Sequence, residues 1–254
     1  MKKKENRIRL DELLIKKGLA EDKKEASALI MSGDIIVNKE RIRKADTLVN
    51  PESEIEIIAK KYVSRGGEKL EGALSDFGLD VKDFICADIG ISTGGFTDCL
   101  LKNGAKKVYG FDVGYGVVDY SIRTDKRVVL FERCNFKNFD CSTIKEKMDL
   151  VLIDVSFISV RKILPNALSL LKPDGKILIL LKPQFEAPKE DVMRGGMMND
   201  VEVVKRLNVD IQKFIKELGC EIVGFLPSRL KGAKGNQEYF ILIKQTISIP
   251  ETNP

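Results

Sequence analysis

The first fifth of the chain places apolar residues at helical spacing and then changes to short β-like runs. Leu10, Leu13 and Leu14 lie at positions i, i+3 and i+4, which is the spacing of one face of an amphipathic helix. Gly18 follows where a helix usually ends. The pattern therefore predicts a small α+β module with helices over 7–17 and 22–32, a strand at 35–37, a turn at 38–40 and a second strand over 54–58.

The rest of the chain alternates between helical segments and strand-like apolar runs. Its first helix contains Leu70, Ala73, Leu74 and Phe77 and ends at Gly78. Such alternation predicts an α/β domain with a mainly parallel, doubly wound sheet and right-handed crossovers. We expect its strands near 84–89, 107–112, 127–131, 149–154, 176–181, 220–225 and 239–244.

The change of pattern near residue 60 predicts a boundary between two domains. A chain of 254 residues is long enough for one sizeable core and a smaller module. We expect the small module over 1–59, a linker at 60–63 and the α/β domain over 64–254.

The composition excludes several kinds of chemistry. The chain has no histidine, which removes Ser-His and Cys-His nucleophiles, histidine metal ligands and the commonest general base. Its five cysteines are scattered without a C-x-x-C pair, so we expect reduced thiols in a cytoplasmic protein. No apolar stretch approaches the length that crosses a bilayer. We therefore expect neither a metal nor a membrane among its partners.

Positive charge is concentrated in the first 44 residues. Residues 1–44 contain thirteen lysines and arginines but eight acids, whereas the remainder of the chain is balanced. A basic segment beside a neutral body indicates a docking surface for a polyanion. A solvated lysine-rich face has the same composition, and charge alone leaves both interpretations open.

A glycine-rich loop follows the first predicted strand of the α/β domain. Asp88 precedes a G-x-x-x-G-G pattern over 90–95, which differs from the G-x-G-x-x-G of dinucleotide enzymes. Asp112 ends the next strand, about 20 residues further on, where an acid is well placed to bind ribose hydroxyls. The loop favours S-adenosylmethionine, which has no pyrophosphate, over a nicotinamide cofactor. The predicted cofactor contacts are Asp88, Gly90, Ser92, Thr93, Gly94, Gly95, Phe96, Asp112, Val113 and Asn135.

Ionisable side chains lie next to the apolar runs at one expected edge of the sheet. Asp154 follows the fourth strand, Lys182 follows the fifth and Glu238 precedes the last, while Lys69 lies in the helix before the sheet. Strand ends in such folds line the ligand crevice. A single ionisable residue there is consistent with a surface position, but four that converge on one edge indicate a catalytic group.

These motifs resemble those of the TlyA, or hemolysin A, family of ribosomal RNA 2′-O-methyltransferases, which are relatives of the FtsJ ribose methyltransferases. The resemblance implies a seven-stranded, Rossmann-like class I methyltransferase sheet, and the first module resembles the α-L RNA-binding domain. The family's Lys-Asp-Lys-Glu catalytic tetrad falls on Lys69, Asp154, Lys182 and Glu238. Val117 and Tyr62 depart from the family pattern, where glutamine and tryptophan are common. The matching stretches are S-R-G-G-x-K-L at 64–70, D-I-G-I-S-T-G-G-F-T at 88–97, F-D-V-G-Y-G at 111–116, D-V-S-F-I-S at 154–159, K-P-Q-F-E at 182–186 and G-N-x-E at 235–238.

The implied reaction explains the residue types of the tetrad. A ribose hydroxyl is a very weak acid, so it must lose its proton as it attacks the methyl carbon. Without histidine, a neutral lysine is the best base, and burial or a nearby positive charge favours the neutral form of a lysine. We predict that Lys182 is the base, that Asp154 and Glu238 orient the lysines, and that Lys69 gives electrostatic support. The reverse assignment of the two lysines stays open, and the scheme needs no metal.

The resemblance also implies ribosomal RNA as the substrate. Family targets are cytidines in 23S rRNA and, in longer relatives, also in 16S rRNA, and the short ends of this chain favour the large subunit. Phe157 and Tyr62 are candidates to stack on a base splayed out of the RNA, or else packing residues. The predicted RNA-binding residues are Arg7, Arg9, Lys16, Lys17, Arg41, Arg65 and Phe157.

Three alternatives belong to other functional classes. The hemolysin name implies a membrane-lytic protein, for which the sequence offers no long apolar segment. A nicotinamide-dependent oxidoreductase would use the same strand ends but a different glycine pattern. A non-catalytic RNA-binding protein would not require the four tetrad residues.

Overall fold

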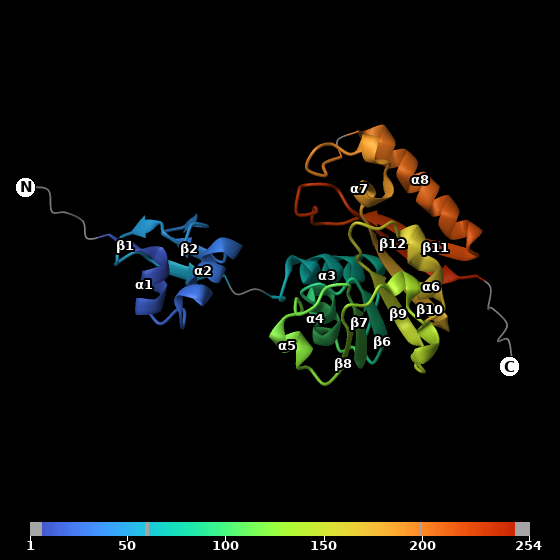
Figure 1. The fold of residues 1–254 in the computed structure, drawn as a ribbon, viewed down its shortest axis with the longest axis horizontal. Helices are drawn as coiled ribbons and strands as arrows, with labels where there is room; N and C mark the ends of the chain where they lie inside the picture. The colour runs from blue at the N-terminus through green and yellow to red at the C-terminus, as the bar shows by residue number, and fades with distance from the viewer. Residues whose placement is uncertain (1–6, 59–60, 199, 247–254) are drawn as a thin grey trace, which may run out of the picture. The chain divides into compact units, whose positions relative to one another are not determined.

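The computed structural model describes residues 7–58, 61–198 and 200–246. The chain divides between Lys61 and Tyr62 into two units (Figure 1). Tyr62 and Val63, which the expected linker at 60–63 includes, belong to the second unit. Tyr62 is buried in its core, and the Val63 amide donates a hydrogen bond to Asp98 Oδ2 at 2.8 Å.

The first unit packs two helices against short strands. Its apolar core contains Leu10, Leu13, Leu14, Ile30 and Ile35, each at most 1% exposed. The predicted helical spacing therefore directs these side chains inward. The elements are β1 (Ile8–Arg9), α1 (Leu10–Lys16), α2 (Lys23–Ser32), β2 (Ile35–Val37), β3 (Glu40–Arg41), β4 (Leu48–Val49) and β5 (Ile55–Ile57).

Two details of this unit differ from the sequence prediction. The first helix begins at Leu10 and not at Arg7, because β1 pairs with β4 before the helix starts. The sequence predicts two strands, at 35–37 and 54–58, with a turn at 38–40. The structure instead has a three-stranded sheet here, since β2 pairs with both β3 and β5. Asn38 and Lys39 connect β2 to β3 with positive φ angles of 48° and 70°, a turn geometry that matches the twist of paired strands.

The second unit contains one seven-stranded sheet in the order β11-β12-β10-β9-β6-β7-β8. β10, β9, β6, β7 and β8 are parallel to their neighbours in this series, whereas β12 is antiparallel to both β10 and β11. The predicted mainly parallel, doubly wound sheet is confirmed. Its strands are β6 (Ile85–Ile89), β7 (Lys107–Phe111), β8 (Val128–Phe131), β9 (Met148–Ile153), β10 (Leu171–Leu181), β11 (Cys220–Pro227) and β12 (Tyr239–Gln245).

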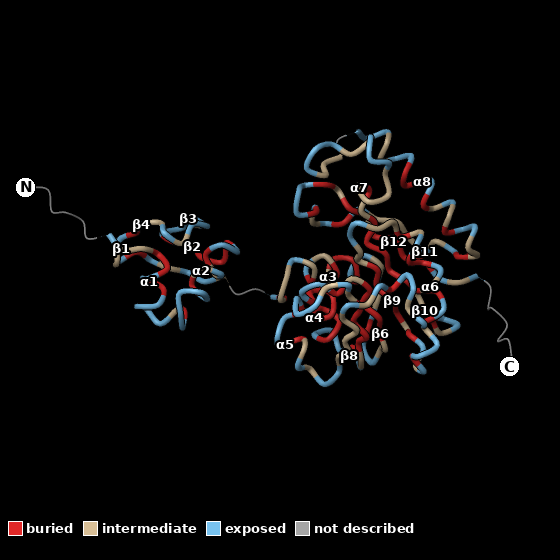
Figure 2. The backbone as a smooth tube through the Cα atoms, in the orientation of Figure 1, coloured by how far each residue is buried: buried red, intermediate tan, exposed pale blue. Residues whose placement is uncertain are grey.

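Helices cover both faces of this sheet, and the strands between them are buried (Figures 1 and 2). Along β9, Leu150 and Leu152 pack on the face of α3, α4 and α5, whereas Val151 and Ile153 pack on the face of α6 and α8. Strands buried on both faces explain the continuous apolar runs in the sequence. The helices are α3 (Arg65–Phe77), α4 (Gly95–Lys102), α5 (Tyr120–Arg123), α6 (Leu164–Leu168), α7 (Pro183–Glu186) and α8 (Val201–Glu217), with short 3₁₀ turns η1 (Phe136–Asn138), η2 (Cys141–Thr143), η3 (Val160–Lys162) and η4 (Lys189–Asp191).

The loops that follow the parallel strands β6, β7, β9 and β10 emerge at the same edge of the sheet. This is the edge at which open α/β sheets bind ligands. Within the parts of the chain that the structure describes, no helix has the length and apolarity needed to cross a membrane.

Candidate active site

The loop between β6 and α4 passes very close to its neighbours. Gly90 has φ +91°, and a Cβ atom there would lie 2.5 Å from the carbonyl oxygen of Asp154. A Cβ atom at Gly95, in the first turn of α4, would overlap the hydroxyl of Ser64. Glycine at these two positions therefore allows the loop to lie against both β9 and the start of α3.

Asp88 is a fully buried acid at the end of β6. Its Oδ2 accepts a hydrogen bond from Thr97 Oγ1 at 2.7 Å, whereas its Oδ1 has no hydrogen-bond partner among the described residues. Burial raises the pKa of Asp88 to about 7; the Thr97 hydroxyl opposes this rise and the nearby charge of Asp154 adds to it. Buried hydrogen-bond acceptors are normally paired. The unpaired Oδ1 therefore indicates that a bound ligand supplies a donor here.

Two adjoining cavities lie along this loop, with volumes of about 480 and 330 Å³. Asp112 shapes the larger one, because its carboxylate accepts hydrogen bonds from the amides of Ser92, at 2.8 Å, and Gly114, at 2.7 Å. Gly94, predicted to contact the cofactor, lines neither cavity and instead precedes α4 with φ +96°. Among the other predicted cofactor residues, Asp112, Val113 and Asn135 line the larger cavity, Asp88, Thr93, Gly95 and Phe96 line the smaller, and Gly90 and Ser92 line both.

The four predicted catalytic residues form two lysine–carboxylate pairs. Lys69 Nζ lies 2.6 Å from Glu238 Oε2, and Lys182 Nζ lies 2.6 Å from Asp154 Oδ1. Lys182 also donates a hydrogen bond to Ser156 Oγ at 3.0 Å, a contact that the sequence did not predict. Both lysine side chains are 12% exposed, so each ammonium group is held largely out of water.

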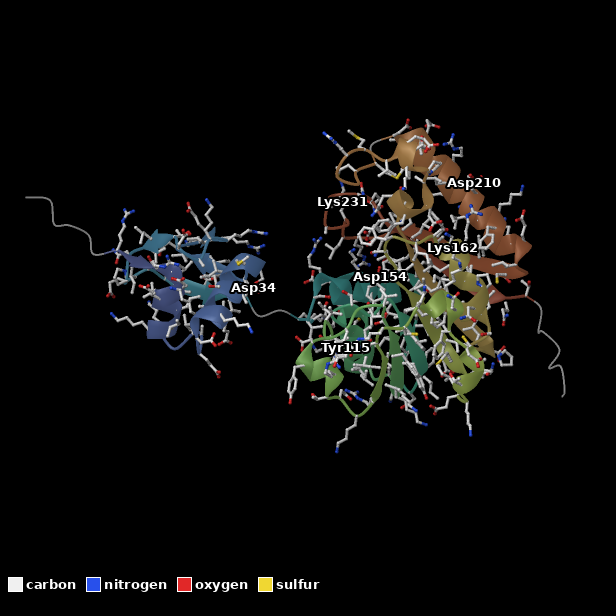
Figure 3. The ribbon with its side chains drawn as sticks, viewed as in Figure 1. Asp34, Tyr115, Asp154, Lys162, Asp210 and Lys231 are labelled. Atoms are coloured by element: carbon white, nitrogen blue, oxygen red, sulfur yellow. The ribbon has the colours of Figure 1, made fainter. Side chains whose placement is uncertain are left out.

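A third cavity, of about 290 Å³, joins these pairs to the first two cavities. It is lined by Lys69, Lys182 and Glu238, and Lys69 also lines the 330 Å³ cavity. Asp154 lines the first two cavities and lies near the middle of the second unit, at the end of β9 (Figure 3). The structure therefore brings the four residues together at the junction of the three cavities.

The start of α3 fixes the position of Lys69. The Ser64 side chain caps this helix by accepting a hydrogen bond from the Gly66 amide at 3.3 Å. Gly67 then lies directly against the ring of Tyr62, which is only 3% exposed. Tyr62 offers no free face to an RNA base, so its predicted stacking role is wrong and the packing alternative is correct.

Comparisons with known proteins agree with this geometry. A family model of the FtsJ-like methyltransferase matches residues 62–245, and an S4 domain model matches residues 8–55. Hemolysin A of Brachyspira hyodysenteriae is 43% identical over 91% of this chain and 98% of that protein. The 16S/23S rRNA (cytidine-2′-O)-methyltransferase TlyA of Mycobacterium tuberculosis is 38% identical over 94% of this chain and 90% of that protein. This chain belongs to the TlyA/hemolysin A family.

A solved structure supports the same assignment. A hemolysin-like protein from Streptococcus thermophilus is 35% identical, with a TM-score of 0.74, and the match covers 97% of this chain and 92% of that one. The predicted fold class is confirmed: a class I methyltransferase sheet follows a small α+β domain of the S4 type. The methyltransferase match excludes the nicotinamide-dependent alternative for this domain.

Phe157 combines an exposed side chain with a strained backbone conformation. It is 92% exposed and has φ +63°, a left-handed conformation that is costly for a bulky residue. Its ring lies 5.0 Å from that of Phe185. Glu186, which the sequence analysis did not single out, holds the same loop by accepting hydrogen bonds from Ser159 Oγ, at 2.5 Å, and the Val160 amide, at 2.8 Å.

The predicted RNA-binding residues of the S4 domain differ in their contacts within the protein. Arg9 forms a forked ion pair with the buried Asp11, at 3.0 and 2.7 Å, so it stabilises the domain itself. Lys17 donates to the carbonyl of Ser53 at 3.2 Å. Arg7, Lys16 and Arg41 are exposed, and in the methyltransferase domain the exposed Arg65 donates to the carbonyl of Lys231 at 3.0 Å.

The described residues contain no cluster of three or more cysteine or carboxylate side chains that would hold a metal ion.

Proposed function

We propose that this chain transfers a methyl group from S-adenosylmethionine to the 2′-hydroxyl of a cytidine in ribosomal RNA. The observation that carries the proposal is the convergence of two ion pairs, Lys69–Glu238 and Lys182–Asp154, where the three cavities adjoin. Methylation of a weakly acidic hydroxyl needs a positioned proton acceptor beside an electrophilic methyl group. The two pairs supply positioned lysines at such a place.

The residues along the glycine-rich loop fit S-adenosylmethionine. The unpartnered Oδ1 of Asp88 and the backbone around Gly90 suit the amino-acid end, which brings an ammonium donor. Asp112, Val113 and Asn135 line the larger cavity, which suits the adenosine. When bound, the cofactor supplies the electrophilic methyl group and the positive charge of its sulfonium.

Lys182 is the proton acceptor in this proposal. Its Nζ takes the proton from the ribose 2′-hydroxyl as the hydroxyl oxygen bonds to the methyl carbon and the bond between that carbon and the cofactor's sulfur breaks, which leaves the sulfur as a neutral thioether. Asp154 Oδ1 and Ser156 Oγ lie 2.6 and 3.0 Å from that nitrogen, and these two contacts restrict its position. A lysine accepts a proton only as the free amine.

Lys69 and Glu238, which also line the third cavity, support this step. Glu238 is 3% exposed and fixes the Lys69 ammonium at 2.6 Å. The charged Lys69 stabilises the negative charge that develops on the attacking ribose oxygen.

The substrate class follows from the accessory domain and the relatives. S4 domains bind RNA, and the related protein of Mycobacterium tuberculosis carries a name that specifies cytidines of 16S and 23S rRNA. Phe157 presents an exposed aromatic face beside the third cavity, where a base splayed from the RNA would stack. We propose the large ribosomal subunit as the preferred substrate.

Transfer of a labelled methyl group to purified 50S and 30S subunits that lack the modification tests this function. We expect incorporation into 50S subunits with the wild-type protein and none with Lys182→Ala. Lys213→Ala is the matched control, because this lysine is exposed on α8, away from the tetrad, and should leave the rate unchanged. Incorporation into 30S subunits alone would reverse the proposed preference, and no transfer to either particle would overturn the function.

A further inference from the structure

A fourth cavity, of about 250 Å³, lies directly beside the third cavity. The two share Gln184 and Asn236, and they differ little in volume, at about 250 and 290 Å³. Tyr239 and the first turns of α8, including Val204, form most of its remaining wall. A site that receives one nucleoside in the third cavity therefore has an adjoining space of similar size.

The amide side chains that line this cavity differ in how their hydrogen-bonding groups are used. Both polar atoms of the Asn236 side chain already have hydrogen bonds. Its Oδ1 accepts from the Met198 amide at 2.9 Å, and its Nδ2 donates to the Gly196 carbonyl at 2.7 Å. Gln184 is different, because its Oε1 is buried without a hydrogen-bond partner among the described residues. Leaving a buried acceptor unpaired costs free energy, so a donor on a bound molecule would relieve that cost.

Tyr239 and Asp200 in the wall favour a neutral, flat ligand, and Lys205, which also lines the cavity, is paired with Glu202 at 2.8 Å. The Tyr239 ring is held against Phe225, with ring centroids 5.3 Å apart, and gives the cavity an aromatic wall. Asp200 also lines the cavity, where its carboxylate caps α8 by accepting from the amides of Glu202 and Val203. A carboxylate at this place disfavours a phosphate group, whereas a nucleobase is neutral, flat and able to stack on an aromatic ring.

We propose that this cavity is a subsite for a nucleobase that neighbours the methylated nucleotide in the RNA chain, and that Gln184 accepts a hydrogen bond from an amino group of that base. The inference rests on the proposed methylation of RNA, because it assumes that the target nucleoside occupies the third cavity. A polynucleotide must leave that cavity on at least one side, and the shared Gln184 places the subsite next to it. Uracil, which has no amino group, would fit this acceptor less well than cytosine, adenine or guanine.

Two variants and a matched control test the subsite with the full-length protein and an unmodified rRNA fragment that the wild-type protein methylates. Val204→Phe fills the cavity, whereas Val209→Phe makes the same change at a 63% exposed position of the same helix. We expect Val204→Phe to raise the KM for RNA about tenfold with an unchanged affinity for S-adenosylmethionine, and Val209→Phe to behave as wild type.

Base replacement tests the role of Gln184. The nucleotide on each side of the target is replaced by uridine in turn, and we expect one replacement to raise the wild-type KM about 5- to 10-fold, the contribution of one hydrogen bond in a buried site. Gln184→Leu should remove that discrimination. If the rRNA fragment is methylated but Val204→Phe and the uridine replacements leave the KM unchanged, the subsite is overturned while the methyltransferase proposal stands. If no RNA is methylated by the wild-type protein, the proposed function itself fails.

Discussion

The two lysines of the candidate active site differ in their contacts, and this difference supports the separate roles that we propose for them. Lys69 is bound to one carboxylate that is nearly inaccessible to water, whereas Lys182 contacts both Asp154 and a serine hydroxyl beside the third cavity. A base needs a nitrogen that faces the substrate and can lose its proton. An electrostatic group needs only a fixed positive charge. Arginine has the same positive charge as lysine but does not deprotonate in proteins. Replacing each lysine by arginine therefore distinguishes a base from an electrostatic group.

We therefore expect Lys182→Arg to lower kcat at least about a thousandfold, within the range that a missing general base costs, and Lys69→Arg to retain part of the activity. Single-turnover methylation of rRNA with each variant, at saturating cofactor, measures the difference. A more active Lys182→Arg protein would assign the base to Lys69.

Asp88 gives a pH-dependent contribution to the stability of the ligand-free protein. Burial raises its pKa in the folded protein to about 7, well above its ordinary value near 4. Between these values the folded state holds a proton that the unfolded state releases, so the free energy of unfolding falls as pH rises from about 4 to about 7. Asp88→Asn removes this contribution.

Urea unfolding of both proteins between pH 5 and pH 8 checks the prediction. The stability of Asp88→Asn relative to wild type should increase with pH over this range and level off above about pH 7. A constant difference would show that the Asp88 carboxyl does not titrate in this range in the folded state.

The same variant should bind S-adenosylmethionine less tightly, because the amide lacks the charge that attracts the ammonium of the ligand.

At the level of elements, α7 and the loop that follows β9 are joined at three points. Lys182 contacts Asp154 at one end, the rings of Phe185 and Phe157 meet in the middle, and Glu186 binds Ser159 and Val160 at the other end. Burial raises the pKa of Glu186, and the hydrogen bonds from Ser159 and Val160 oppose that rise. The one-turn helix thus positions the exposed ring of Phe157 as well as Lys182.

Glu186→Ala removes the hydrogen bonds to Ser159 and Val160 and leaves the four tetrad side chains unchanged. We expect it to raise the KM for RNA about tenfold, because Phe157 loses its fixed conformation. In a Phe157→Ala background the same change should add little, since residues that act as a unit give non-additive effects. Fully additive effects in this double-mutant cycle would show that Glu186 acts only on general stability, which thermal unfolding of the four proteins would register.

The sequence predicted the elements of the second unit well because its strands are long and apolar. It predicted that the four tetrad residues lie together because each is next to a strand or helix end. It did not predict the pairing of β1 with β4, because two-residue strands have no periodicity. It did not predict the burial of Tyr62, which depends on the contact with Gly67 rather than on local pattern. The roles of Ser156 and Glu186 likewise depend on contacts between segments distant in the sequence.

At the scale of the whole molecule, an S4 domain with exposed cations is joined to a methyltransferase domain that contains the tetrad. The exposed Lys16 and Arg41 are suited to phosphate contacts, whereas Arg9 is engaged with the buried Asp11. Replacing exposed cations weakens RNA binding and reduces its dependence on salt, because fewer counterions are released.

We expect Lys16→Glu with Arg41→Glu to weaken binding to ribosomal subunits and to reduce the salt slope by about one for each lost phosphate contact, without a change in cofactor affinity. Lys213→Glu with Lys216→Glu makes the same change in net charge on α8 and is the control. Filter binding at several salt concentrations measures both. Equal losses in the two double variants would mean that net charge alone, and not the S4 surface, determines binding.

The central claim is that the methyl group is transferred to a ribose oxygen. Mass spectrometry of nucleosides from 50S subunits methylated in vitro tests it directly, because ribose and base methylation give different fragments. We expect 2′-O-methylcytidine with the wild-type protein and none with Lys182→Ala. A methyl group on the cytosine ring, or 2′-O-methylcytidine that persists in the variant, would contradict it.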